Sequence, residues 1–128
     1  MSLLELLIAM VLLAFVALSV TPMLMLGMLT SSVAQEATEL AVAAGDRLEF
    51  LAALPFSDPA LVAGGDTSTS LAGYSEDPYA GDSNRYVRWE ISDETAILKR
   101  IALIAGARGT IFGPTREVRI ETFRANLR

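Results

Sequence analysis

The 128-residue sequence contains no cysteine and no histidine. The lack of cysteine excludes disulfides and thiolate chemistry, and the lack of both residues removes the commonest ligands of transition metals. A Ser-His-Asp triad is excluded as well, because there is no histidine to act as its base. No other pairing of a nucleophile with a base stands out. We therefore expect no enzyme activity, no cofactor and no metal site.

Charged residues are also missing from Leu6 to Gln35, a run of 30 residues. A helix of about 20 apolar residues crosses a bilayer, so this run is long enough to span one. A cleaved signal peptide has a basic start and a shorter apolar core, whereas no Lys or Arg precedes this run and no A-x-A cleavage signal ends it. We expect the segment to stay in the working protein, as the anchor of one small domain.

The charges that are present are unevenly distributed along the chain. Residues 1–84 carry ten acidic residues and one base, Arg47, whereas residues 85–128 carry five acidic residues and nine bases. The net charges of the two parts are therefore −9 and +4. Parts of opposite charge suit packing against each other, within a chain or between copies. Two solvated surfaces of unlike sign would give the same counts, and both interpretations stay open.

The helical pattern continues beyond the apolar run. Good helix formers dominate residues 31–54, and Pro55 ends the pattern because the residue before a proline is pushed out of the helical region. The spacing predicts a long helix over residues 1–54, with a transmembrane or filament-core half at 1–30 and an amphipathic half at 31–54. The apolar stripe of the second half consists of Val33, Ala37, Leu40, Ala44, Leu48 and Leu51.

The rest of the chain differs in composition and in periodicity. Turn-forming residues are dense from 55 to 84, which predicts a long variable loop. Residues 85–128 alternate with a period of two and predict three strands of an antiparallel β-meander, with Gly106, Gly109 and Gly113 in the turn of its last hairpin. One face of this sheet needs a cover, which the amphipathic half of the helix can supply. We expect an α+β fold in the form of a lollipop, a long N-terminal α-helix packed on a small antiparallel sheet.

The opening residues MSLLELLIAM, with Glu5 among them and Pro22 downstream, resemble the type IV pilin and pseudopilin superfamily. The stretch RLEFLAALPFSDPALVAGG is similar to the helix exit of minor pilins and pseudopilins. The resemblance implies removal of a leader by a prepilin peptidase and N-methylation of the new first residue, Met1. The chain departs from the family pattern at Met1, where Phe is commoner, at Ala14, where major pilins often have Gly, and in lacking the paired cysteines of many major pilins.

The resemblance also implies roles for two residues that are costly in an apolar helix. Glu5 would pair with the N-terminal amine of a neighbouring subunit, selecting subunits and fixing their register. Pro22 would mark a kink or melted zone between about residues 14 and 22. Without the resemblance, Glu5 is a snorkelling charge at a membrane edge, and Pro22 lies in an ordinary kinked membrane helix.

The function expected from the resemblance is that of a structural subunit of a type IV pilus-like filament. Its implied partners are copies of itself or related pilins, the bacterial inner membrane before assembly, and an assembly platform with its ATPase. The subunit would be a single-pass inner-membrane protein first and part of an extracellular or periplasmic filament afterwards. Alternatives are a pseudopilin of a type II secretion system and a single-span anchor that presents a periplasmic binding domain.

Two further interpretations are less favoured. Nucleic acid is a candidate partner through Arg85, Arg88, Lys99, Arg100 and Arg119, although the net charge of −5 opposes it. Oxygen ligation of Ca²⁺ by loop carboxylates is the other, and a solvated loop explains the same residues, namely Asp66, Glu76, Asp77 and Asp82.

Overall fold

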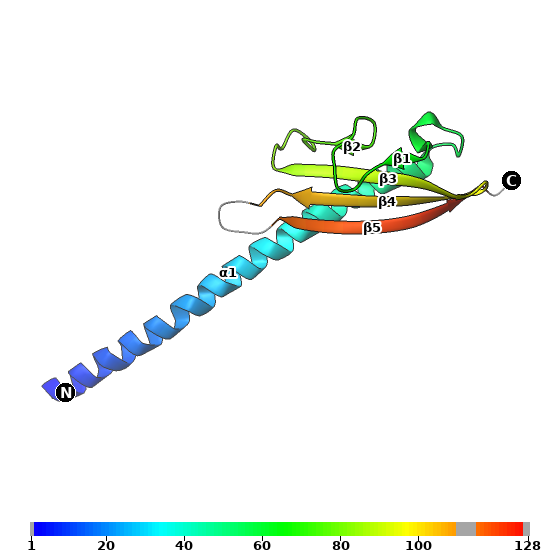
Figure 1. Ribbon diagram of the computed structural model, residues 1–128. Helices are drawn as coiled ribbons and strands as arrows, with labels where there is room; N and C mark the ends of the chain where they lie inside the picture. The colour runs from blue at the N-terminus through cyan, green and yellow to red at the C-terminus, as the bar shows by residue number, and fades with distance from the viewer. Residues whose placement is uncertain (1, 110–114, 127–128) are drawn as a thin grey trace. The chain divides into compact units, whose positions relative to one another are not determined.

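The fold is α+β, as the sequence predicts. A computed structural model describes residues 2–109 and 115–126. In chain order, its elements are helix α1 (Leu3–Ala53), the 3-10 turn η1 (Pro59–Leu61), and the strands β1 (Gly64–Gly65), β2 (Ser75–Glu76), β3 (Arg85–Thr95), β4 (Leu98–Ala107) and β5 (Arg116–Ala125) (Figure 1). The chain divides into two compact units, residues 1–36 and residues 37–128, which we call the helix unit and the head unit.

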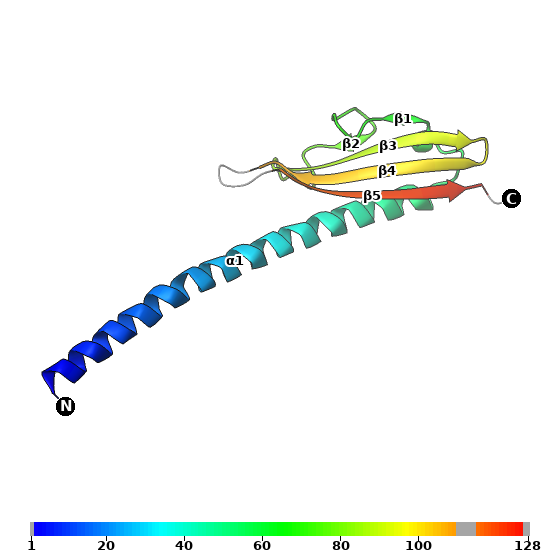
Figure 2. The ribbon, with the colours of Figure 1, turned by 60° about the horizontal axis from the view of Figure 1, so that its bottom comes forward.

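The head unit contains one antiparallel sheet of five strands in the order β1-β3-β4-β5, with β2 also paired to β3 (Figure 2). The predicted meander of three strands is confirmed as its centre. Its register places Trp89 of β3 opposite Leu103 of β4, and Leu103 opposite Ile120 of β5. Since directly opposed residues share a face, these three side chains line the same side of the sheet.

The segment between α1 and β3 is more ordered than the predicted loop. Gly64 pairs with Ile91, and Ser75 pairs with Arg88, so that β1 and β2 both lie along the outer edge of β3. Gly65 adopts a φ of 88°, and a Cβ there would come within 2.3 Å of the Trp89 carbonyl oxygen. Only glycine fits this close approach to a neighbouring strand. Strands of two residues carry no periodic signal, which is why the sequence pattern did not indicate them.

The prediction that Gly106 lies in a turn is wrong. Gly106 lies within β4, opposite Tyr86 of β3, and a Cβ on Gly106 would come within 2.4 Å of the Tyr86 side chain. The glycine therefore makes room for an aromatic ring that lies across the sheet. Gly109 follows β4 without regular structure, and Gly113 lies outside the described residues.

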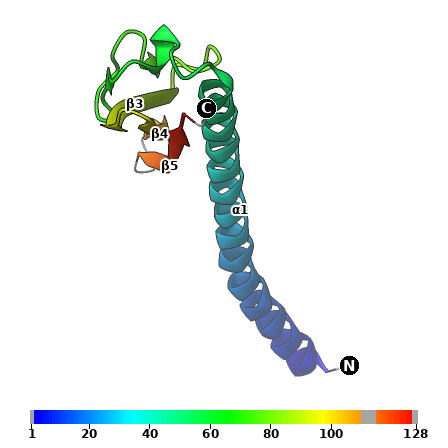
Figure 3. The same ribbon diagram turned by 90° about the vertical axis from the view of Figure 1, so that its right-hand side faces the viewer.

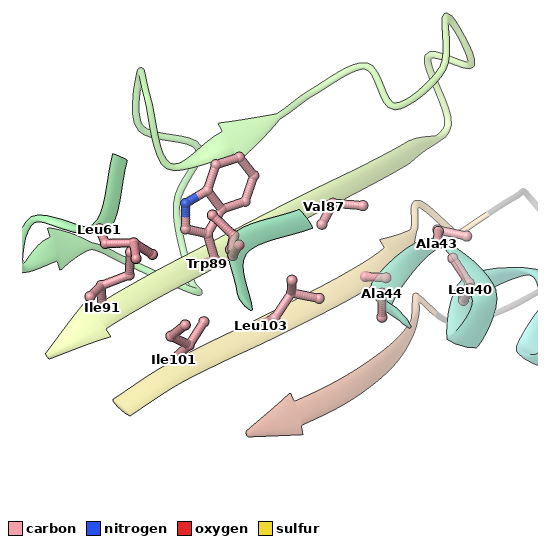
Figure 4. Packing of buried hydrophobic residues seen from close by; sticks show 12 residues of the cluster. Leu40, Ala43, Ala44, Leu61, Val87, Trp89, Ile91, Ile101 and Leu103 are labelled. Carbon is pink, nitrogen blue, oxygen red and sulfur yellow. The ribbon is translucent and has the colours of Figure 1, made fainter. Parts of the chain in front are cut away.

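The core of the head unit lies between the sheet and the second half of α1, which run side by side (Figure 3). The buried residues of the helix are Leu40, Ala43, Ala44 and Leu51. Three of them belong to the predicted stripe, whose Leu48 is half-buried and whose Val33 and Ala37 are exposed. The buried helix residues meet residues from the inner face of the sheet and from η1 (Figure 4), which are Leu61, Val87, Trp89, Ile91, Ile101, Leu103, Ala105 and Ala107. The amphipathic half of the helix thus covers the sheet, as predicted.

This packing predicts unequal effects of two nearby truncations. The Leu40 side chain is 2% exposed and that of Val42 is 56% exposed. Leu40→Ala should lower the free energy of unfolding by about 2–5 kcal/mol through lost burial and a cavity, whereas Val42→Ala should change it by less than about 0.5 kcal/mol. Denaturant unfolding of the solubilised chain, followed by fluorescence of the single tryptophan, measures both. Equal effects would contradict the packing.

Candidate functional site

The helix unit presents an apolar surface on every side. Residues 2–35 are all exposed, including side chains as large as Leu18 at 74% and Met23 at 76%. Successive residues of a helix point about 100° apart, so a run this uniform leaves no polar face. By length and composition, α1 is long and apolar enough to cross a membrane. Such a surface needs a cover, either lipid or other apolar helices.

Several hydroxyl groups in the helix unit are satisfied by the helix itself. Four of them donate hydrogen bonds of 2.8–2.9 Å to carbonyl oxygens three or four residues earlier; they belong to Ser19, Thr21, Thr30 and Ser32. In hydrocarbon, a polar group without a partner is costly because no water can bind it. These hydroxyls therefore suit an apolar environment.

Pro22 lies inside α1 without interrupting it. The helix is continuous from Leu3 to Ala53, including the zone from 14 to 22. Proline has no N–H to donate to the carbonyl of Leu18, four residues earlier, so this turn of the helix holds one hydrogen bond fewer than its neighbours. The single chain thus carries a weak point rather than a break. Kinking or melting of this zone in a filament stays a prediction.

Glu5 has a partner within its own chain. The backbone N–H of Ser2 donates to Oε2 of Glu5 at 3.3 Å, and the N–H of Glu5 lies 3.3 Å from Oγ of Ser2. Together they form a capping box, in which two side chains satisfy backbone donors at the start of a helix. The spacing Ser-x-x-Glu is a known signal for this motif, and the sequence analysis missed it. Met1, the expected methylated terminus, lies outside the described residues.

Charges in the head unit pair across the two oppositely charged parts of the sequence. Arg85 forms an ion pair with Glu39 of α1 and another with Asp82 at 3.3 Å. Arg88 and Arg108 both reach Asp77, which lies between β2 and β3. Several acidic residues of the first part therefore pair with basic residues of the second within one chain, and pairing between copies stays a prediction.

Asp77 is the centre of the most connected of these clusters. Nη2 of Arg108 donates to both carboxylate oxygens, at 2.6 and 2.5 Å, and the Ser70 hydroxyl donates to Oδ2 at 2.7 Å. Hydrogen bonding from Arg108 lowers the pKa of Asp77 below 3.8, and the Ser70 hydroxyl and the charge of Arg88 act in the same direction. The carboxylate thus connects the segment before β3 to Arg88 of β3 and to Arg108, which follows β4, at the open end of the β3–β4 hairpin.

Asp66 uses its carboxylate in a local turn. It accepts hydrogen bonds from the hydroxyl and the N–H of Ser68, at 2.6 and 2.8 Å, and from the Thr69 hydroxyl at 3.0 Å. These bonds, those from Ser68 above all, lower its pKa. Of the four carboxylates considered for Ca²⁺, those of Asp66, Asp77 and Asp82 therefore serve separate structural contacts, and no group of three metal-ligating side chains forms in residues 2–109 and 115–126.

Tyr86 covers the outer face of the sheet beneath this cluster. Its ring is 4% exposed, and its hydroxyl donates to Glu117 of β5 at 2.5 Å. The guanidinium groups of Arg88 and Arg108 lie 4.1 and 5.5 Å from the ring centre. Burial, with the hydrogen bond to the Glu117 carboxylate, raises the pKa of Tyr86 to about 12. The ring therefore stays neutral and can bind both cations through its face.

The lowered pKa of Asp77 predicts a stabilisation that depends on pH. The charged carboxylate stabilises the fold above its unfolded pKa, near 3.8, and this contribution is lost as the pH falls through the lower folded value. Asp77→Asn should therefore destabilise the chain at pH 7, and the gap to the wild type should shrink below pH 3.8. Thermal midpoints at several pH values test this; a gap that stays constant would contradict it.

No family model matches this chain, and no curated protein or solved structure matches it either. Similarity therefore does not show a family, and what the chain does is inferred from its own residues.

Proposed function

We propose that this protein is a structural subunit of a type IV pilus-like filament. The observation that carries the proposal is the charge-free run of 30 residues in the helix unit, which is exposed on every side and is preceded by the carboxylate of Glu5. Before assembly the membrane covers this surface, and after assembly the same surface packs against helices of other subunits. Both environments are apolar, so one sequence suits both.

Glu5 supplies the specificity that an apolar surface lacks. Apolar helices slide past one another at little cost, because lipid and leucine side chains offer similar contacts. A buried carboxylate that meets the N-terminal amine of a neighbouring subunit adds little net stability, but losing the partner costs several kcal/mol, about 3–5. Subunits in the wrong register are therefore penalised. The proposal includes removal of a leader and methylation of Met1, so that the amine belongs to the first residue of the mature chain.

Two alternatives share the exposed helix. A pseudopilin of a type II secretion system would use the same contacts in a shorter periplasmic fibre. A plain anchor with a periplasmic binding domain would need the membrane alone and would form no polymer. Nucleic-acid binding is weaker, because each of the five candidate bases has a carboxylate partner in the head unit: Arg85, Arg88, Lys99, Arg100 and Arg119.

The capping box allows the charge of Glu5 to be tested separately from its structural role. Glu5→Gln removes the charge but keeps a side chain that can complete the cap, whereas Ser2→Ala removes part of the cap and keeps the charge. We expect Glu5→Gln to abolish filaments, seen by electron microscopy of sheared cells, and to leave the subunit in the membrane. Ser2→Ala should still assemble, as should the control Glu49→Gln on the exposed face of α1. If Glu5→Gln assembled filaments as well as the wild type does, the charge of Glu5 would not be needed for assembly, and the residue would have a capping role only.

Processing offers a second test that does not depend on mutagenesis. Mass spectrometry of the protein from native membranes should find an N-terminal peptide that begins at Met1 and carries one methyl group on its amine. A chain that keeps a longer N-terminus, or an unmethylated Met1, would remove the amine that Glu5 is proposed to meet and would favour the plain anchor.

A further inference from the structure

A small hollow lies in the head unit between α1 and the segment around β2. Its volume is about 220 Å³, and it is lined by Asp46, Arg47, Phe50, Glu76, Tyr79 and Ala80. Pockets for small-molecule ligands are usually larger, roughly 300–1,000 Å³. This hollow therefore suits a single side chain better than a metabolite.

The two carboxylates of this hollow have no partner in the described part of the chain. The carboxylates of Asp46 and Glu76 make no hydrogen bond or ion pair with any described residue, unlike those of Asp66, Asp77 and Asp82. Two carboxylates without a partner in one hollow leave it with unbalanced negative charge, which suits a cation supplied from outside the chain.

The other lining residues support the same ligand. The Arg47 guanidinium lies 4.9 Å from the ring centre of Phe50 and 4.3 Å from that of Trp89, so it is stacked between two aromatic rings. Its Nε is buried without a hydrogen-bond partner in the described residues. The two carboxylates outnumber this one cation, and the lining also includes Phe50 and Tyr79, aromatic side chains of the kind that attract a guanidinium.

The basic residues of the head unit differ in whether their partners are distant or close in the sequence. Most reach acceptors elsewhere in the fold; examples are Lys99, which donates to the Leu61 carbonyl oxygen at 2.5 Å, and Arg124, which donates to that of Leu51 at 2.9 Å. Arg119 of β5 is different, because its partner is Glu121, two residues along the same strand. Its side chain is 54% exposed, and such an exposed local pair is easily replaced.

The hollow and Arg119 belong to opposite edges of the sheet. Glu76 is part of β2, which pairs with β3 at one edge, and Arg119 is part of β5, which is the strand at the other edge. A contact between two different surfaces of one chain is heterologous, and contacts of this kind that do not close into a ring generate helical filaments.

We propose that the hollow receives the Arg119 side chain of a second copy of this chain, as the contact between neighbouring heads. The guanidinium lies between the Asp46 and Glu76 carboxylates and against Phe50 and Tyr79. The inference rests on the proposed function, and it identifies the head surfaces that meet in the filament.

Charge reversal tests the contact in full-length protein expressed in its native cells. Asp46→Arg and Arg119→Glu should each reduce the number of filaments by roughly tenfold or more, since like charges or a lost partner then meet at the interface. The control Glu49→Arg changes a neighbouring exposed helical acid that does not line the hollow, and it should assemble normally. The double variant Asp46→Arg/Arg119→Glu should restore filaments to within about twofold of the wild type.

Co-expression of the two single variants separates a broken contact from a misfolded head. In a mixed filament in which they alternate, Arg at position 46 of one variant meets Glu at position 119 of the other, and the unchanged Asp46 meets the unchanged Arg119. We therefore expect filaments when the two variants are expressed together, although neither variant forms filaments alone. Misfolded subunits would not assemble together.

The remaining outcomes overturn the proposal in distinguishable ways. If the wild type forms filaments and either reversal assembles as well as the wild type, the heads meet elsewhere and the filament function stands. The heads also meet elsewhere, and the filament function stands, if both reversals prevent assembly and neither the double variant nor co-expression restores filaments. If the wild type forms no filament, the proposed function fails and this contact fails with it.

Discussion

A helix that is apolar on every side cannot bury its surface by resting on one neighbour, because at least half of it would stay in water. Each Å² of apolar surface removed from water is worth about 25 cal/mol, so the helix unit is costly unless something surrounds it. From Leu40 onward the same helix has a single apolar stripe, and the sheet is enough to cover it. The chain divides into its two units near Glu36, where the first pattern gives way to the second.

Charged residues in the head unit mainly form ion pairs that connect segments distant in sequence. Asp77 holds Arg88 and Arg108 together, and Glu39 ties α1 to the start of β3 through Arg85. Exposed pairs of this kind contribute little each, yet Asp77 is 14% exposed and joins several donors at once. The long segment before β3 has few apolar residues in the core, so these contacts compensate for the burial that it lacks.

Periodicity in the sequence was sufficient for the long helix and the three-stranded meander, because both patterns extend over ten residues or more. It could not find β1 and β2, whose two residues each are fixed by pairing with β3 rather than by local preference. Gly106 was wrongly assigned to a turn for a similar reason, because strand pairing, and not the local sequence, places Tyr86 against it. The hollow beside Arg47 combines helix residues with the segment from 76 to 80, which no spacing rule connects.

The two contacts of the proposed filament differ in their energetics. Glu5 accepts the hydrogen bond from the Ser2 N–H at Oε2, and the other oxygen of its carboxylate can accept one from a neighbour's amine. A bond from a charged amine is about twice as strong as one between neutral groups, but the cost of burying both charges offsets much of that gain. Asp46 and Glu76 have no partner among the described residues to give up, so the proposed contact costs only the exposed local pair between Arg119 and Glu121. In the proposed filament, register would therefore depend on Glu5, whereas cohesion between heads would depend on carboxylates that have no partner among the described residues of the single chain.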